Sequence, residues 1–192
     1  YFADVDNRFR ERTGTIPTDG RNPFENDYGR LISSAPIRRL QDKTQVFSLG
    51  ESDFTRTRLT HSLEVSYIGS SIGQSIEKLL IEKGEIEEKH KGYLSSLLRV
   101  AGLVHDLGNP PFGHFGEEAI KNFFKDYFAK NANKGLTGDL TELEKADFIN
   151  FDGNVQTFRI LSKLYYFGDE YGYNLSGSSP LTFFKASINI EP

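Results

Sequence analysis

The side chains with the clearest chemical potential lie between residues 103 and 118, where an apolar segment runs into a turn. His105 and Asp106 are adjacent, and His114 and Glu117 follow a Gly-Asn-Pro-Pro-Phe-Gly turn that cannot continue a helix. A histidine and an aspartate do not enter an apolar core cheaply, because a buried charge needs a partner or a metal. The stretch therefore predicts a cation-binding site.

Composition limits both the metal and the partner. The chain has no cysteine, so a metal would be bound through nitrogen and oxygen atoms. Such ligands suit several divalent ions, among which we expect manganese or magnesium before iron, cobalt, nickel or zinc. The formal net charge of -4 argues against a general nucleic-acid binder, whose domain is usually basic. An anionic substrate must therefore meet a local basic patch.

A long helix over residues 55–83 is expected to position part of this site. Arg58 and His61 lie three residues apart on it, so their side chains project from one side, and a guanidinium beside a histidine suits a phosphate next to a metal. Gly84 should end the helix. Apolar residues recur at three- and four-residue steps and predict its buried face. They are Leu59, Leu63, Val65, Ile68, Ile72, Ile76, Leu79 and Leu80.

Further helices are predicted on either side of the Pro-Pro turn. Residues 94–107 form a nearly continuous apolar run, which indicates a central buried helix ending at His105 and Asp106. A helix over residues 117–130 is expected to turn its aromatic stripe inward, and His114 and Glu117 can meet if the turn enters helix there. The stripe consists of Ile120, Phe123, Phe124, Tyr127 and Phe128. Weaker helical patterns follow over 139–149 and after the turn at 152–154.

The whole pattern predicts an all-α fold. We expect an irregular N-terminal arm over residues 1–29, a helical domain over 30–167 and an irregular tail over 168–192. A short helix over 30–40 should be interrupted by Pro36. No run approaches the roughly 18 apolar residues of a membrane span, and no signal peptide is evident, so a cytoplasmic protein is expected. The lack of methionine and the start at Tyr1 suggest an incomplete chain.

Four sequence blocks resemble the deoxyguanosine triphosphate triphosphohydrolases of the HD superfamily. They are Ser-Ser-Ala-Pro-Ile-Arg-Arg-Leu-Gln-Asp-Lys-Thr-Gln-Val at 33–46, Thr-Arg-Leu-Thr-His-Ser-Leu-Glu-Val at 57–65, His-Asp-Leu-Gly-Asn-Pro-Pro-Phe-Gly-His-Phe-Gly-Glu at 105–117 and Phe-Asp-Gly-Asn-Val-Gln-Thr-Phe-Arg-Ile-Leu at 151–161. The resemblance covers roughly residues 22–165 in one order. It implies an HD-domain helical bundle that is an N-terminal fragment of a larger helical enzyme.

The resemblance also implies roles for individual residues. His61, His105 and Asp106 match the family's metal ligands, and its fourth ligand, an aspartate, would lie beyond Pro192. His114 and Glu117 match the pair that acts on the water and the leaving group, although acids also favour the first turn of a helix for its own sake. The expected substrate contacts are Arg58, Arg39, Lys43, Asn109, Asn154 and Gln156. Arg39 could equally belong to a solvated helix face, and Asn154 and Gln156 could only hold a turn.

The implied reaction is attack at the α-phosphorus of a deoxynucleoside triphosphate, with dGTP as the first substrate to try, releasing deoxynucleoside and tripolyphosphate. The residue types alone reach only metal-dependent phosphoester hydrolysis. The alternatives are an HD phosphohydrolase for nucleoside monophosphates or cyclic nucleotides, and a nucleotide sensor without turnover. The family also implies a homo-oligomer, an allosteric nucleotide and, in some members, single-stranded DNA, against which the acidic net charge speaks.

Overall fold

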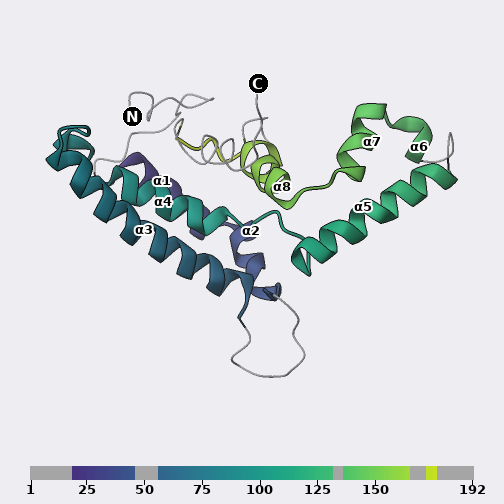
Figure 1. Cartoon of the computed structure of the whole chain (residues 1–192), viewed down its shortest axis with the longest axis horizontal. Helices are drawn as coiled ribbons and strands as arrows, with labels where there is room; N and C mark the ends of the chain where they lie inside the picture. The colour runs from purple at the N-terminus through teal and green to yellow at the C-terminus, as the bar shows by residue number, and fades with distance from the viewer. Residues whose placement is uncertain (1–18, 46–55, 132–135, 165–171, 177–192) are drawn as a thin grey trace.

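The computed structural model describes residues 19–45, 56–131, 136–164 and 172–176. Within these ranges the chain is helical, apart from turns and an isolated bridge between Thr44 and Thr57, which confirms the all-α class. The elements, shown in Figure 1, are α1 (Pro23–Ile32), α2 (Ala35–Arg38), η1 (Arg39–Asp42), α3 (Arg58–Glu82), η2 (Glu88–His90), α4 (Tyr93–Val104), α5 (Gly113–Lys130), α6 (Leu136–Asp139), α7 (Glu142–Ile149), α8 (Gly153–Arg159) and the π-helical η3 (Ile160–Leu164).

Helices α3 and α4 lie side by side in opposite directions (Figure 1). Thr57 caps the start of α3, and Gly84, at a φ of 72°, follows its end as predicted. The two helices approach so closely that a Cβ on Gly102 would lie 2.7 Å from the Cα of Ser66. The Ser66 hydroxyl donates to the Arg99 carbonyl at 2.7 Å across this interface. The antiparallel arrangement brings the start of α3 next to the end of α4.

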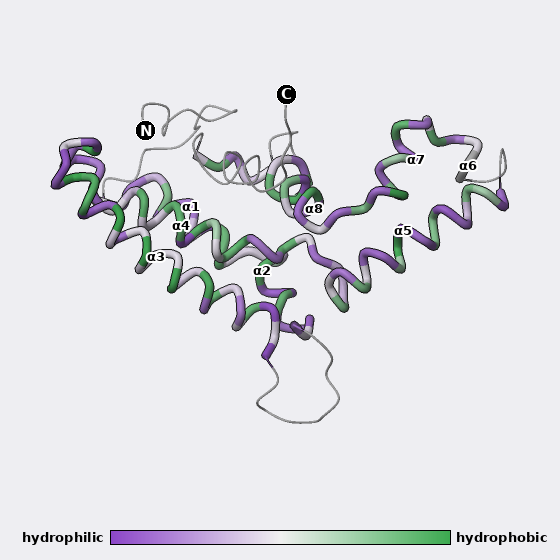
Figure 2. Tube along the Cα trace, in the orientation of Figure 1, coloured by the Kyte–Doolittle hydropathy of each residue, from purple (hydrophilic) through white to green (hydrophobic). Residues whose placement is uncertain are grey.

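The predicted buried face of α3 is wrong for most of its length, although Leu59 packs against the core. Small and polar residues face α4, among them the buried Ser62 and Ser66, whereas Ile68, Ile72 and Leu79 are 56, 51 and 57% exposed. Figure 2 shows the apolar residues recurring along α3. The three- and four-residue spacing locates an apolar stripe on a helix, but it does not say which side a neighbouring helix covers. Close packing against α4 requires small side chains, and these lie on a different side of the helix.

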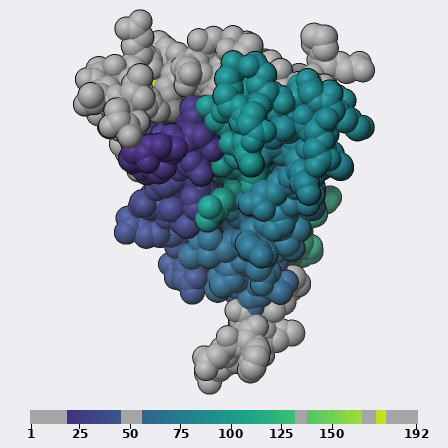
Figure 3. Space-filling view, turned by 90° about the vertical axis from the view of Figure 1, so that its left-hand side faces the viewer, coloured from purple at the N-terminus to yellow at the C-terminus, as the bar shows by residue number. Residues whose placement is uncertain are grey.

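The core lies between α4 and the N-terminal helices, which Figure 3 shows packed beside one another. Its buried residues are Leu31, Ile37, Leu40, Val100, Leu103, Val104, Leu107, Leu161, Tyr173 and Leu175. Residues 23–29 of the predicted irregular arm are helical, because Asn22 and Glu25 form a capping box and Pro23 occupies the first turn. Pro36 lies in the first turn of α2, so it starts a helix and does not interrupt one.

The described part of the predicted tail belongs to this core. Residues 172–176 have no regular structure, as expected, but they are buried. The Tyr173 amide donates to the Leu161 carbonyl at 2.9 Å, and the Ser176 amide donates to Asp27 Oδ2 at 2.7 Å. Residues 168–171 and 177–192 of the predicted tail, like residues 1–18 of the arm, lie outside the described residues.

Helices α5, α6 and α7 extend on the other side of α8 from the α3–α4 pair (Figure 1). Helix α5 packs against α7 through Phe124, whose ring lies 4.5 Å from that of Phe148 between centroids. The predicted inward stripe is therefore only partly correct, since Phe123 is 61% exposed. Among the described residues, no helix combines the length and the apolar character that crossing a membrane requires.

Candidate metal centre

The structure brings together the three residues predicted as metal ligands. His61 lies in the first turn of α3, and His105 and Asp106 follow α4 directly. One potential ligand atom from each residue lies within 4.8 Å of the others. The two imidazole rings are 5.2 Å apart between centroids. This proximity follows from the antiparallel pairing of α3 and α4, which places the start of one helix beside the end of the other.

The hydrogen bonds of His105 suit a metal ligand. Its Nδ1 lies 2.8 Å from the Gly102 carbonyl oxygen. Because a carbonyl only accepts hydrogen bonds, Nδ1 carries the proton and the lone pair remains on Nε2. Nε2 faces Asp106, with 3.5 Å to Oδ1. A backbone partner on the second ring nitrogen is the usual way in which proteins orient a histidine ligand.

The carboxylate of Asp106 is held by three side chains. Arg58 Nη1 donates to Oδ2 at 2.9 Å, Gln45 Nε2 donates to Oδ2 at 3.3 Å, and Asn109 Nδ2 donates to Oδ1 at 2.7 Å. Arg58 is only 2% exposed, so the ion pair is buried. Each carboxylate oxygen has two lone pairs, so these bonds leave Asp106 able to bind a metal. The donor set of two imidazoles and one carboxylate therefore fits a divalent cation with further positions open.

The predicted pairing of His114 with Glu117 is confirmed. Both residues lie in α5, which begins at Gly113, and His114 Nδ1 is 3.0 Å from Glu117 Oε2. The His114 side chain is 97% exposed, whereas Glu117 is buried. Glu117 Oε1 accepts a hydrogen bond from the Gly153 amide at 2.9 Å. The Glu117 carboxylate thus bridges the start of α8 and His114. It does not simply cap the N-terminus of α5, which was the alternative explanation for an acidic residue at this position.

A cavity of about 470 Å³ connects the two groups. Its lining residues come from both sides of the Pro-Pro turn and include one buried cation. They are Gln45, Arg58, Asp106, Asn109, Phe112, Gly113, His114 and Phe115. Arg58 Nε and Gln45 Oε1 are buried and have no hydrogen-bond partner among the described residues. Gln45 was not predicted from the sequence, because a single glutamine in an irregular segment carries no spacing signal.

The predicted substrate contacts divide into two sets. Lys43 Nζ donates to the Asn109 carbonyl at 3.3 Å, and burial together with the nearby Arg58 guanidinium lowers the pKa of Lys43. Arg58 and Asn109 line the cavity, and Lys43 contacts Asn109 from outside its lining. Arg39, Asn154 and Gln156 do not line the cavity either. Arg39 and Asn154 are exposed, Gln156 is half-buried, and the α8 turn is capped by Asp152 Oδ1, which accepts from the Asn154 amide at 2.8 Å.

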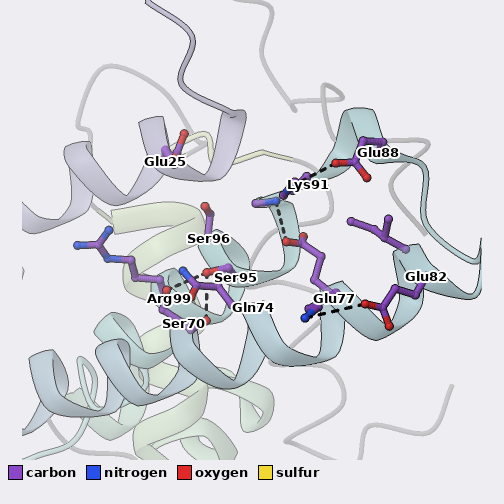
Figure 4. A pocket seen from close by; sticks show the side chains of 13 residues that line it. Glu25, Ser70, Gln74, Glu77, Glu82, Glu88, Lys91, Ser95, Ser96 and Arg99 are labelled. Atoms are coloured by element: carbon purple, nitrogen blue, oxygen red, sulfur yellow. Dashed lines mark hydrogen bonds and ion pairs between the residues drawn. The ribbon is translucent and has the colours of Figure 1, made fainter.

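A larger cavity, of about 670 Å³, lies at the opposite end of the α3–α4 pair (Figure 4). The buried Glu77 carboxylate accepts from the amides of Gly92 and Leu94 at 2.7 and 2.9 Å, so it caps the start of α4. Lys91 pairs with Glu88 at 3.3 Å (Figure 4). Glu77 is thus satisfied by backbone amides and Lys91 by Glu88, and we assign this region a structural role.

A family model matches the part of the chain that carries the candidate site. Residues 58–145 match the HD domain model, and the matched span contains both the candidate metal ligands and the His114–Glu117 pair. The chain therefore contains an HD domain. The predicted resemblance is confirmed by this match and by the curated relatives.

Several curated proteins are similar in sequence to this chain, and those given below share the same description. A protein of Listeria monocytogenes is 49% identical over 89% of this chain, one of Synechocystis is 44% identical over 75%, and one of Pseudomonas aeruginosa is 40% identical over 86%. Each is described as a deoxyguanosinetriphosphate triphosphohydrolase-like protein. The chain covers 38, 32 and 36% of their respective lengths, so it spans less than two fifths of these relatives.

Proposed function

We propose that the protein hydrolyses deoxynucleoside triphosphates in a metal-dependent reaction, with dGTP as the first substrate, releasing deoxynucleoside and tripolyphosphate. One observation carries the proposal. A cavity is lined by Asp106 of the His61–His105–Asp106 group, by His114 of the His114–Glu117 pair and by the Arg58 cation. A phosphoester hydrolase needs these three functions next to one another. The description of the curated relatives supports the choice of substrate.

His61, His105 and Asp106 would hold the metal. Manganese or magnesium is our first choice, and iron, cobalt, nickel or zinc would also accept this donor set. A divalent ion of this kind supplies a Lewis acid that polarises a phosphate oxygen and lowers the pKa of water toward about 7. Asn109 and Gln45 hold the Asp106 carboxylate through hydrogen bonds, so the ligand is oriented before a metal binds.

His114 supplies the proton-transfer group. Since a carboxylate accepts hydrogen bonds, the Nδ1–H of His114 donates to Glu117, and the exposed Nε2 is free to exchange a proton with water or with the leaving oxygen. Glu117 orients the ring through this hydrogen bond. Arg58 lines the cavity and Lys43 contacts the Asn109 backbone, so both would supply positive charge for the phosphate groups.

Product analysis tests this proposal. The full-length protein is incubated with each deoxynucleoside triphosphate in the presence of Mn²⁺, Mg²⁺ or EDTA, and the products are separated by chromatography. We expect deoxynucleoside and tripolyphosphate with metal, fastest from dGTP, and no product with EDTA. Release of monophosphate and pyrophosphate would show that a different bond is cleaved. Binding of dGTP without any product would instead indicate a nucleotide sensor.

A further inference from the structure

The candidate proton-transfer pair is held by the first residue of α8. The buried Gly153 amide donates to Glu117 Oε1 at 2.9 Å, and Oε2 of the same carboxylate meets His114 at 3.0 Å. A carboxylate held at one oxygen by a backbone amide presents the other oxygen in a fixed direction. The position of Gly153 therefore determines how Glu117 faces His114.

Asn109 connects this glycine to the candidate metal ligands. The Asn109 amide donates from Nδ2 to Asp106 Oδ1 at 2.7 Å. Its own Oδ1 lies where a side chain on residue 153 would begin, so that a Cβ there would overlap it and would also lie 2.8 Å from Glu117 Oε1. Only glycine at position 153 leaves room for the Asn109 amide to reach Asp106 in this orientation.

Further contacts fix the start of α8 to the turn after α4. Thr157 is fully buried, and its hydroxyl oxygen accepts from the Gly108 amide at 2.8 Å and donates to the Gly153 carbonyl at 3.1 Å. A Cβ on Gly108 would overlap the Thr157 nitrogen and the Gly153 oxygen. The backbones of α8 and of the turn after α4 therefore lie in close contact at Gly108, where an added atom would not fit.

We infer that Gly153 and Asn109 are positioning residues for the reaction. Gly153 orients Glu117 toward His114, and Asn109 holds Asp106 while packing against the same glycine, so the proton-transfer pair and the metal ligands keep one fixed separation. This inference rests on the proposed function. It assigns Asn109 to the support of Asp106, whereas the sequence-based expectation was a contact between Asn109 and the substrate.

A double-mutant cycle in the full-length protein tests the inference. Asn109→Ala removes the bond to Asp106, and Gly153→Ala adds a methyl group that displaces the same amide. Each variant should lower kcat by about 10- to 100-fold, the range for residues that support a metal ligand, with KM near the wild-type value. Gly153→Ala also crowds Glu117 Oε1, but both changes disturb the Asn109 amide, so the double variant should lose less than the product of the two single losses. Losses that multiply would overturn the inference.

A metal-binding measurement provides a readout that does not need turnover. Calorimetric titration with Mn²⁺ should show weaker binding for Asn109→Ala and Gly153→Ala. Val155→Ala is the matched control on α8, since Val155 is 41% exposed, and it should retain wild-type Mn²⁺ binding and kcat. Wild-type Mn²⁺ affinity in Asn109→Ala would overturn the inference, and this variant decides the matter alone if Gly153→Ala does not fold. A wild-type protein that binds Mn²⁺ but cleaves no nucleotide would count against the proposed function only.

Discussion

Arg58 shows how one residue can serve two purposes at the candidate centre. Its guanidinium is buried and donates to Asp106 at 2.9 Å, which compensates a carboxylate that would otherwise be costly to bury. Arg58 also lines the cavity. The planar guanidinium has five donors, so Arg58 can hold Asp106 and still offer a hydrogen bond to a phosphate.

For Lys43 we predict a pH-dependent contribution to the stability of the folded protein. Burial and the Arg58 charge lower its pKa in the folded protein relative to the usual 10.5, so the folded state releases this proton at a lower pH than the unfolded state. Between the two pKa values the unfolded state binds more protons, and stability therefore rises with pH. In chemical denaturation, the stability of wild type relative to Lys43→Met should increase as the pH rises toward 10.5.

The control for this prediction is Lys78→Met, which removes an exposed lysine of α3. If Lys43→Met followed Lys78→Met at every pH, burial of the Lys43 ammonium would not contribute to stability.

At the scale of elements, the sequence predicts the structure correctly where a single local pattern determines a helix boundary or a contact within one helical turn. The limits of α3 followed from apolar spacing and Gly84, and the meeting of His114 with Glu117 followed from their separation within one turn. The covered face of α3 did not follow, because the small residues that allow close approach to α4 give no hydrophobic signal. The hydrogen bond from the Gly153 amide to Glu117 links residues 36 positions apart, and a contact of this range cannot be predicted from local sequence spacing.

Packing of α3 against α4 yields a second prediction. Gly102→Ala would place a Cβ 2.7 Å from Ser66 Cα and 2.9 Å from Val65 C, which are backbone atoms that cannot rotate away. Alanine favours a helix by up to about 1 kcal/mol over glycine, but overpacking costs about 1–3 kcal/mol. We therefore expect a net loss of stability in urea denaturation, with the metal ligands shifted as well.

Gly29→Ala in α1 is the matched control. The nearest atom to its new Cβ is the flexible end of Arg21 at 3.8 Å, so this variant should be neutral or slightly more stable. Equal stability changes in the two variants would contradict the close packing of α3 and α4.

At the scale of the whole molecule, the candidate site lies where three parts of the fold meet. The α3–α4 pair supplies the metal ligands, α5 supplies His114 and Glu117, and the start of α8 joins them (Figure 1). The apolar stripe of α3 around Ile72 is not covered by the described residues, and the chain spans less than two fifths of the length of the curated relatives. The activity of the full-length protein is therefore the proper test of the site.

The central claim is that His61, His105 and Asp106 hold one divalent ion. Calorimetric titration of metal-free protein with Mn²⁺ measures this directly, in wild type, in His105→Ala and in the control His90→Ala, whose ring packs against Tyr93 on a different part of the chain. We predict one ion bound by wild type and by His90→Ala, and a loss of that binding in His105→Ala. Wild-type binding by His105→Ala would contradict the account.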